Sequence, residues 1–413
     1  MSYSQALTGL SAASSDLDVI GNNISNANTV GYKQSSTQFA AMYAGALSTA
    51  TAAGGGIGTT VQKVSQAFTQ GSITETGSTL DLAINGNGFF TLSNNGTSVY
   101  SRNGQFQLDK DGSIVNAQGL KLMGYQADAS GAISTAAPSA LTVPSGAMQP
   151  AVSTSVSAEL NLKSSSTTPS TTPFSVSDTS SYNNSTSVQV YDSLGNAHKL
   201  SLYFVRNADP TDTTGTAASG ASWSVYSVLD SDTQASGNMT LSFDTSGKPT
   251  GTTTSTLSID PGQGAAAAQS IALDLSKVTQ YGSDFAVTSL STDGYASGQL
   301  SSFAIDTGGT LTGTYSNGKT ATLGQVALAN FTNPDGLQNL GNNVFAQSAT
   351  SGNALLGTAG TGSLGSLKSG ATEASNVDLT SSLVDLITAQ RYYQANAQTI
   401  KTQQSVDQTL MNL

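Results

Sequence analysis

Apolar side chains near the C-terminus recur at alternating steps of four and three residues, with polar side chains at three of the same steps. Residues 376–413 contain no Gly and no Pro, so this spacing predicts one long helix with a heptad seam that faces a partner. Outside the seam the stretch carries mostly Ser, Thr, Asn and Gln, which favours protein contacts on several sides. The seam positions are Leu379, Leu383, Leu386, Gln390, Tyr393, Ala397, Ile400, Gln404, Asp407 and Met411.

A second amphipathic pattern lies at the N-terminus. A helix that starts at the N-cap Ser4 places five apolar side chains on one face, and the Asn-rich stretch that follows should end it near Asn26. Two interpretations stay open from spacing alone: a helical hairpin packed on its own domain, or paired chain ends that serve as an assembly device. The apolar positions are Leu7, Leu10, Leu17, Ile20 and Ile24.

Between the two helices the apolar period changes to two, which predicts strands. We expect a mainly β protein with terminal α-helices paired in a coiled-coil-like layer and nested all-β domains between them. Residues 34–70 are rich in small residues, Ala and Gly above all, and predict a linker. The expected parts are an N-terminal helix (1–33), the linker (34–70), an inner β domain in two parts (71–142 and 299–370), an inserted outer all-β domain (143–298) and a C-terminal helix (371–413).

The composition argues against several classes of function. Charged residues make up 9% of the 413 residues, against about 25% in a typical soluble protein, and the net charge is −11. This balance argues against nucleic-acid binding, because no basic stripe is available to neutralise phosphates. No apolar run reaches the length of about 18 residues that a membrane span needs, so we expect no membrane insertion. The N-terminus lacks the pattern of a cleavable signal peptide.

Candidate chemistry is sparse. Cysteine is absent, and a catalytic triad would have to use the single histidine, His198, with Asp192 or Asp230 as its orienting group. A lone His on a predicted strand is more often a packed or surface residue, and the pair Asp230 and Asp232 lies in loop-like sequence typical of solvated carboxylates. We therefore expect no enzyme, with no catalytic residues, no cofactor and no metal.

One acidic motif allows two interpretations, a calcium loop or a hairpin turn. The segment 109–112 (Asp-Lys-Asp-Gly) could open a calcium loop, but Ile114 and Leu120 stand where an EF-hand requires Gly and Glu. A hairpin turn between two short strands is the favoured interpretation.

Five groups of residues, in order along the chain, resemble the shared motifs of the bacterial flagellar rod and hook (axial) proteins. The first runs from Ser11 to Lys33 and contains Asn22-Asn23-Ile24-Ser25-Asn26-Ala27-Asn28. The others are 82–90; 100–104 with 108–112 and 115–119; 331–337 with 341–343; and 373–413. The length of the chain and its large insertion are similar to the hook-type members.

The resemblance implies a structural subunit that self-assembles into a flexible extracellular tube, links rod to filament and transmits torque. It implies an inner layer formed by the terminal helices, with all eleven apolar helix positions Leu7, Leu10, Leu17, Ile20, Ile24, Leu379, Leu383, Leu386, Tyr393, Ile400 and Met411 as subunit-assembly residues. Implied partners are further copies of the chain, the rod protein, the hook-filament junction protein, the hook cap and the flagellar type III export apparatus. A distal rod protein of the same family, or an unrelated secreted β-rich adhesin, remains the alternative.

Overall fold

The chain folds into two compact units, each with its own hydrophobic core. The computed structural model describes residues 3–43, 56–128, 130–134, 136–208, 221–230, 232, 235, 237–260, 262, 264–265 and 269–411. Unit 1 comprises Met1–Ser145, Ser301–Thr314 and Thr320–Leu413, and unit 2 comprises Gly146–Leu300 with Tyr315–Lys319. Unit 2 thus occupies the expected insertion, with boundaries at 146 and 300 where the composition indicated 143 and 298. The prediction of a mainly β protein with a helix at each end is confirmed.

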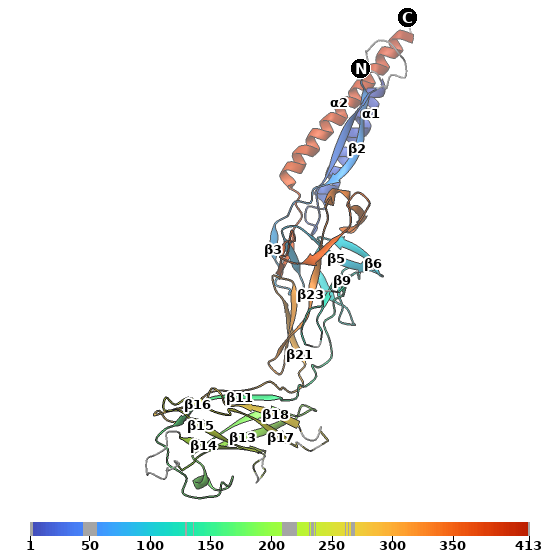
Figure 1. Ribbon diagram of the computed structural model, residues 1–413. Helices are drawn as coiled ribbons and strands as arrows, with labels where there is room; N and C mark the ends of the chain where they lie inside the picture. Colours follow the sequence, from blue (N-terminus) through green and yellow to red (C-terminus); the bar gives the residue numbers. More distant parts are fainter. Residues whose placement is uncertain are drawn as a thin grey trace. The chain divides into compact units, whose positions relative to one another are not determined.

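Two helices run side by side in unit 1, α1 (Tyr3–Ser25) and α2 (Leu379–Met411) (Figure 1). The side chain of Asp378 accepts hydrogen bonds from the backbone N–H groups of Thr380 and Ser381, which makes it the N-cap of α2. Helix α1 ends one residue before Asn26, whose N–H still bonds back to the carbonyl of Asn22. Both boundaries agree with the sequence signals.

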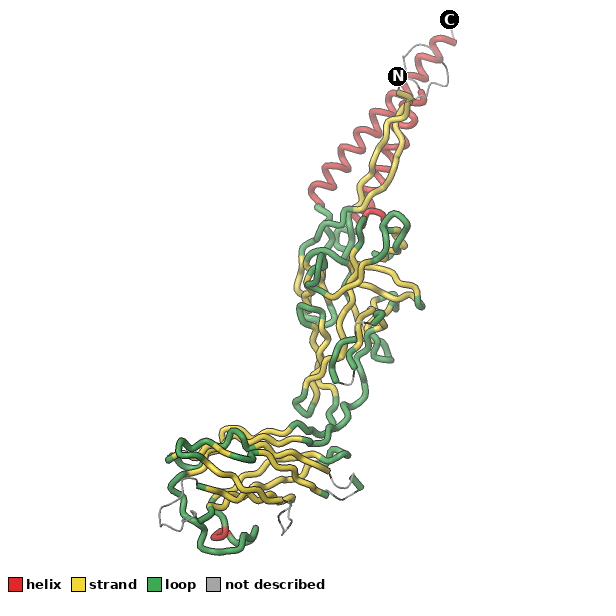
Figure 2. Tube along the Cα trace, in the orientation of Figure 1, coloured by secondary structure: helices red, strands yellow, loops and turns green. Residues whose placement is uncertain are grey.

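An antiparallel hairpin, β1 (Ser35–Tyr43) and β2 (Gly56–Gln66), lies along α1, as the yellow strands beside the helices in Figure 2 show. The expectation of a linker over 34–70 is therefore wrong for these two strands, and the centre of the Gly-rich stretch, 44–55, lies outside the described residues. Gly58 explains why small residues fill this segment. It has a φ of +133°, and a Cβ there would overlap the Oγ1 of Thr8 in α1. Close approach to a helix, rather than apolar alternation, selects the residues of β2.

The β part of unit 1 is built on a twelve-stranded sheet with the central order β21-β22-β23-β9-β5-β6-β25-β24. Five aromatic rings meet edge to face in its core, with centroids 4.8–6.1 Å apart; they belong to Phe68, Phe89, Tyr100, Phe331 and Phe345. The strands of this sheet are β5 (Phe89–Asn94), β6 (Thr97–Ser101), β7 (Phe106–Leu108), β8 (Ile114–Asn116), β9 (Lys121–Gln126), β10 (Ser139–Ala140), β21 (Leu300–Ile305), β22 (Thr310–Tyr315), β23 (Thr320–Asn330), β24 (Gln338–Gly341), β25 (Val344–Ala346) and β26 (Leu355–Thr358).

Two short two-stranded sheets connect this β part to the chain ends. Strand β3 (Ile73–Glu75) pairs with β28 (Ala371–Glu373), and β4 (Leu82–Asn85) pairs with β27 (Ser366–Ser369). The 3-10 turn η2 (Pro334–Gly336) precedes β24. These pairings bring the segment before α2 next to the segment after the hairpin.

Unit 2 is a β-sandwich. One sheet has the order β12-β13-β14-β15-β16, and the other has the order β17-β18-β11-β19 with β20 also paired to β11. Alternate side chains of both sheets point into one core that contains Trp223, Phe204 and Phe243. The elements are β11 (Ser155–Lys163), η1 (Thr179–Ser181), β12 (Asn184–Tyr191), β13 (Ala197–Arg206), β14 (Ser222–Leu229), β15 (Gly237–Phe243), β16 (Pro249–Thr250), β17 (Thr254–Ile259), β18 (Gln269–Asp274), β19 (Thr279–Tyr281) and β20 (Ala286–Thr292).

One turn design recurs in both units. In each case an Asp or Asn Oδ1 accepts hydrogen bonds from the backbone N–H groups two and four residues further on, and the glycine three residues on has a φ between 76° and 85°. The leading residues are Asp109, Asn116, Asp128, Asp192, Asp244 and Asp306. The side chain replaces backbone partners that the turn leaves unpaired, and only glycine adopts this φ without strain. The prediction of a turn at 109–112 is confirmed.

The separate cores predict separable folding. Replacing residues 146–300 with a short Gly-Ser linker should leave unit 1 with a cooperative thermal transition, because every member of the unit 2 core lies within the deleted stretch. Circular dichroism and calorimetry of the shortened protein beside the full chain provide the measurement. A broad, non-cooperative melt of the shortened protein would show that the two units share a core.

Candidate functional site

Three buried charged side chains meet where the two terminal helices join the β part of unit 1. Glu373 lies between Lys33 and Arg102, with Nζ of Lys33 2.6 Å from Oε1 and Nη1 of Arg102 3.1 Å from Oε2. The side chains of Lys33 and Glu373 are 0% exposed and that of Arg102 is 3% exposed. Lys33 follows α1, Arg102 follows β6, and Glu373 ends β28 just before α2. We call these three residues the anchor.

Hydrogen bonds satisfy most of the remaining capacity of the anchor. The Lys33 ammonium also donates to the carbonyl of Thr69 at 2.7 Å, and Nη2 of Arg102 donates to the carbonyl of Gly86 at 2.8 Å. The N–H of Gly71 donates to Oε1 of Glu373 at 2.9 Å. Burial lowers the pKa of Lys33 and of Arg102, and the charge of Glu373 opposes that shift in both. The carboxylate thus compensates for the removal of both cations from water.

Two asparagines extend the anchor to the hairpin. The Asn376 side chain accepts from the N–H of Gln34 at 2.7 Å and donates to the carbonyl of Ala67 at 2.8 Å, so it closes the open end of the β1–β2 hairpin. The buried Asn23 of α1 both donates to and accepts from the backbone of Ser35. Through these contacts α1, the hairpin and the segment leading into α2 are joined at one place, beside the anchor. We call this place their common root.

Small residues make up most of the buried positions of the two helices. The buried positions are Ala6, Ala12, Ala13, Ile20 and Asn23 in α1 and Ser382 and Ala389 in α2. Gly9 lies directly against Asn396, since a Cβ on Gly9 would be 2.9 Å from Oδ1 of that side chain. Because Gly9 is near the start of α1 and Asn396 is beyond the middle of α2, the two helices run antiparallel from their common root.

This arrangement differs from the predicted seam. The helical hairpin is present within one chain, but the buried residues of α2 are Ser382 and Ala389, whereas Leu379 and Leu383 are exposed. Of the eleven predicted assembly residues, Ile20 is buried and five are half-buried, namely Leu10, Leu17, Ile24, Leu386 and Ile400. The other five are exposed, namely Leu7, Leu379, Leu383, Tyr393 and Met411. The heptad pattern did not reveal the contact because small residues form it.

One face of the first turns of α2 is apolar and uncovered in the single chain. Leu379, Leu383, Val384 and Ile387 are 45–58% exposed and follow each other at helical spacing. Soluble monomers rarely leave such a continuous row of large apolar side chains in water, so this outer face indicates a protein partner.

The single histidine sits in a structural ion pair of unit 2. His198 of β13 is 5% exposed, its Nδ1 is 2.7 Å from Oδ2 of Asp230, and its Nε2 is 3.3 Å from Oδ2 of Asp192. Both ring nitrogens face carboxylates, which leaves neither to activate a serine, so a triad is not formed. The expectation of a packed histidine is confirmed. The expectation that Asp230 is merely solvated is wrong, because it also accepts the N–H of Lys199.

The pKa values of His198 and Asp192 shift in opposite directions. Burial lowers the pKa of His198, but the hydrogen bonds and charges of Asp230 and Asp192 outweigh it and raise the pKa above 6.5. Burial disfavours the charged form of Asp192, yet the bonds from Asn196 and His198 hold its pKa at about 2. The two carboxylates thus favour the imidazolium form of His198 over the neutral ring.

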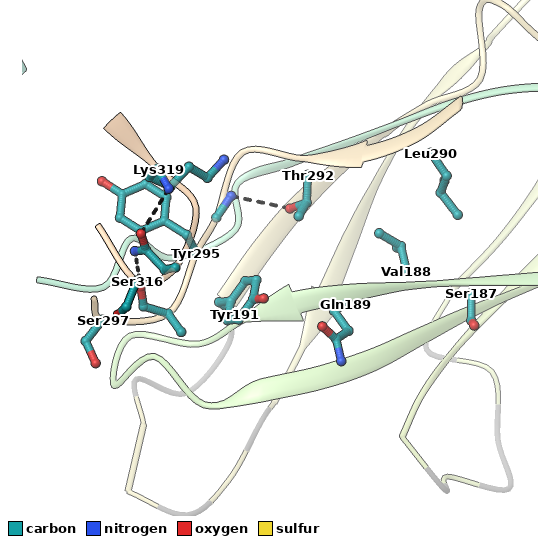
Figure 3. A pocket seen from close by; sticks show the side chains of 13 residues that line it. Ser187, Val188, Gln189, Tyr191, Leu290, Thr292, Tyr295, Ser297, Ser316 and Lys319 are labelled. Atoms are coloured by element: carbon teal, nitrogen blue, oxygen red, sulfur yellow. Dashed lines mark hydrogen bonds between the residues drawn. The ribbon is translucent and has the colours of Figure 1, made fainter. Parts of the chain in front are cut away.

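The sandwich of unit 2 also has a cavity of about 640 Å³ at the edge strands β12 and β20 (Figure 3). Tyr191, Gln189 and Thr292 line it from the strands, and Tyr295 and Lys319 from the adjoining loops. Lys319 is the only charged lining residue, and its Nζ lies 5.4 Å from the centre of the Tyr295 ring. Apart from Lys319 this lining contains no charged side chain, and none of its hydroxyl groups is paired to a carboxylate or an imidazole, so it defines no catalytic centre.

The described residues show no group of three or more His, Cys, Asp or Glu side chains placed to hold a metal ion. Within the same residues, neither helix has the length and hydropathy required to cross a bilayer.

Comparisons with known proteins assign the class. Four family models match: the flagella basal body rod protein model over residues 5–33, the flagellar hook protein FlgE/F/G D1 domain over 83–159, the flagellar basal body protein FlaE D2 domain over 160–295, and the flagellar basal body rod FlgEFG protein C-terminal model over 368–413. The four matched segments are those of flagellar rod and hook proteins.

Full-length relatives make the assignment specific. The chain is 44% identical to the flagellar hook protein FlgE of Salmonella typhimurium, with 100% of both chains covered, and 43% identical to that of Escherichia coli, again over both whole chains. It is 31% identical to the flagellar hook protein FlgE of Treponema pallidum, with 98% of each chain covered. The chain belongs to the flagellar hook protein FlgE family. These matches decide against the rod-protein and adhesin alternatives.

A solved structure agrees in fold. The crystal structure of Helicobacter pylori flagellar hook protein FlgE2 aligns with a TM-score of 0.54 at 16% identity, covering 71% of this chain and 99% of that one.

The anchor predicts a large effect of one substitution. Glu373→Gln should lower the free energy of unfolding of unit 1 by about 3–5 kcal/mol, because it leaves two buried cations without a carboxylate. Urea unfolding measures this. Glu75→Gln serves as the control, because Glu75 pairs with Lys368 on the surface and its loss should change little. Equal unfolding curves for the two variants would show that the anchor contributes no stability.

The histidine pair predicts a pH dependence of unit 2. Because its folded-state pKa is raised, His198 contributes stability that is complete below about pH 6.5 and is lost as the pH rises through that pKa. The lowered pKa of Asp192 contributes stability that is complete above about pH 4 and is lost as the pH falls toward 2. The melting temperature of His198→Gln should therefore approach that of the wild type as the pH is raised to about 9. Lys199→Gln is the control, and a wild-type advantage that is the same at all these pH values would contradict the assignment.

Proposed function

We propose that this chain is the structural subunit of a flexible extracellular tube, the flagellar hook, which links rod to filament and transmits torque. The observation that carries the proposal is the uncovered apolar outer face of α2, formed by Leu379, Leu383, Val384 and Ile387, on a helical layer already paired within the chain. Membership of the hook protein family supports the same function.

An open tube needs contacts in which one face of the subunit meets a different face of the next copy. The antiparallel helix pair offers two unlike faces, since α2 presents large apolar side chains while α1 is partly covered by the β1–β2 hairpin. The outer face of α2 then packs against the helical layer of neighbouring copies. On this basis all eleven predicted helix positions, from Leu7 to Met411, act in assembly, some through the intrachain pair and the exposed ones between copies.

A tube that bends requires contacts between outer domains that can slide. Only 9% of the residues are charged, and the sandwich of unit 2 has a core independent of unit 1. Two surfaces rich in uncharged Ser and Thr can slide past each other at a lower free-energy cost than two surfaces joined by ion pairs. Torque requires, in contrast, that each helix stays fixed to its own β part, and the anchor supplies that fixation.

The role proposed is structural and not enzymatic. We further propose that the subunit is exported through the flagellar type III apparatus without a cleavable signal peptide. In the assembled flagellum its partners are other copies of itself, the rod protein, the hook-filament junction protein and the hook cap. Electron microscopy of purified chain at high concentration tests the central point, since tubes of one component are expected.

The outer face of α2 predicts a separation between folding and assembly. The double variant Leu383→Asp with Ile387→Asp should melt like the wild-type monomer, because both side chains are half in water already. It should fail to form tubes, because burial of each aliphatic side chain contributes about 1 kcal/mol or more and a buried Asp adds a desolvation cost.

Sedimentation of polymer beside thermal melting of monomer provides the measurement. Leu194→Asp is the matched control, since Leu194 is an equally exposed leucine in a turn of unit 2. Normal polymer yield from the double variant would exclude this face from the contact.

A further inference from the structure

An uncharged cavity of about 430 Å³ opens in unit 1 beside the C-terminal end of α1. Side-chain amides dominate its lining, with Gln118, Thr29 and Tyr32 completing most of the rest. Six asparagines line it: Asn22, Asn26, Asn103, Asn339, Asn342 and Asn343. We call it the amide pocket.

The walls of the amide pocket are held by internal hydrogen bonds. The Tyr32 hydroxyl lies 3.0 Å from Oδ1 of Asn23 and 3.3 Å from Oδ1 of Asn22. Nδ2 of Asn26 donates to Oδ1 of Asn22 at 2.8 Å, and Nδ2 of Asn343 donates to the carbonyl of Val30 at 3.0 Å. Asn103 uses its Oδ1 to accept from the N–H of Gln105. These bonds fix the shape of the pocket before any ligand is bound.

Other amide groups in the lining are available. Among the described residues, the side chains of Gln118 and Asn342 form no hydrogen bond, and both are exposed. Asn103 and Asn339 use only their oxygens, on the backbone of their own turns, so their NH₂ groups are free within the same residues. A primary amide donates and accepts in the manner of a peptide group, so a cluster of them matches main-chain N–H and C=O groups rather than a charged side chain.

The lining residues belong to the shared sequence motifs, but they are not the residues of those motifs that form the anchor. Asn22, Asn26, Thr29 and Tyr32 belong to the motif 11–33, Asn103 and Gln118 to the motifs 100–104 and 115–119, and Asn342 and Asn343 to 341–343. Three stretches that are far apart in the chain thus place amides around one opening, while the apolar residues of the same stretches fill the core.

We propose that the amide pocket binds the main chain of an uncharged turn from a second copy of this chain. The proposal rests on the proposed function, since the second copy is a neighbour in the tube. The chain supplies the matching surface, because it contains 43 Gly and few charges, so many of its turns present backbone that no large side chain shields. The pocket gives each subunit a directional, uncharged contact that complements the non-directional packing of the outer face of α2.

Charges placed in the pocket should disrupt this contact without affecting the fold. The double variant Gln118→Glu with Asn342→Asp changes no shape but puts two carboxylates against main-chain carbonyls. The control is Asn95→Asp with Gln107→Glu, which adds the same charges to exposed positions of unit 1 outside the pocket. Asn95 has a φ of 49° and Asn342 a φ of 52°, so the pair is matched in backbone conformation as well.

The critical concentration for tube formation should rise about tenfold or more for the pocket variant and stay at the wild-type value for the control. Monomer melting temperatures should be equal in all three proteins. Tubes from the pocket variant at the wild-type concentration would overturn the amide pocket as a contact. A wild-type chain that forms no tubes at all would instead overturn the proposed function, so the two failures are distinguishable.

A crosslinking experiment identifies the occupant directly. Because the chain has no native cysteine, Gln118→Cys carries a single benzophenone maleimide, and Gln107→Cys is the control. Tubes made from mixed ¹⁴N and ¹⁵N subunits should give crosslinks at position 118 that join light and heavy chains, with uncharged turn peptides as the partners. Crosslinks from position 118 that stay within one chain would overturn the proposal.

Discussion

The anchor is the contact on which the rest of unit 1 depends. A buried carboxylate without cations, or two buried cations without a carboxylate, costs several kcal/mol, so Lys33, Arg102 and Glu373 are stable only together. Their meeting joins residues 340 positions apart and fixes where both helices leave the β part. The hairpin and the close contact between α1 and α2 follow from this common root, because α1 ends and α2 begins there, and two antiparallel helices held at that point need only small side chains to stay close.

The helical layer divides its apolar residues between two tasks. Within the chain, Gly9 allows close approach of α1 to α2 at Asn396. Between chains, the larger side chains Leu379, Leu383 and Ile387 remain available. A seam of Leu facing α1 would have made a more stable monomer, but it would have left little apolar surface for other copies. The division explains why α2 is long and yet buries so few of its own residues.

Much of this was predictable from sequence. Period-two patterns, the Asp-Lys-Asp-Gly turn at 109–112 and the Gly- and Pro-free stretch 376–413 located strands, a hairpin and α2, because each depends on neighbouring residues. The hairpin at 35–66 was missed because contact with α1 selects glycine and other small residues, which look like a linker when read alone. The anchor was missed because each of its charges is unremarkable locally, although in a chain with so few charges a Lys, an Arg and a Glu inside shared motifs could have been examined as a set. Asp230 was misjudged because the loop-like sequence around it is typical of solvated carboxylates, although its possible pairing with His198 had been considered.

Nested topology also imposes an order on folding. The core of unit 2 lies within one continuous stretch, 146–300, so it can form while the C-terminal part of the chain is still being synthesised or threaded through a channel. The anchor closes a loop of 340 residues and therefore carries a large loop-closure entropy. The Lys33 ammonium therefore stays hydrated, without its ion-pair partner, until Glu373 is available. A common root for the helices thus exists only in a chain that has emerged almost completely, and a subunit truncated before Glu373 has no means of presenting the outer face of α2 to a growing end.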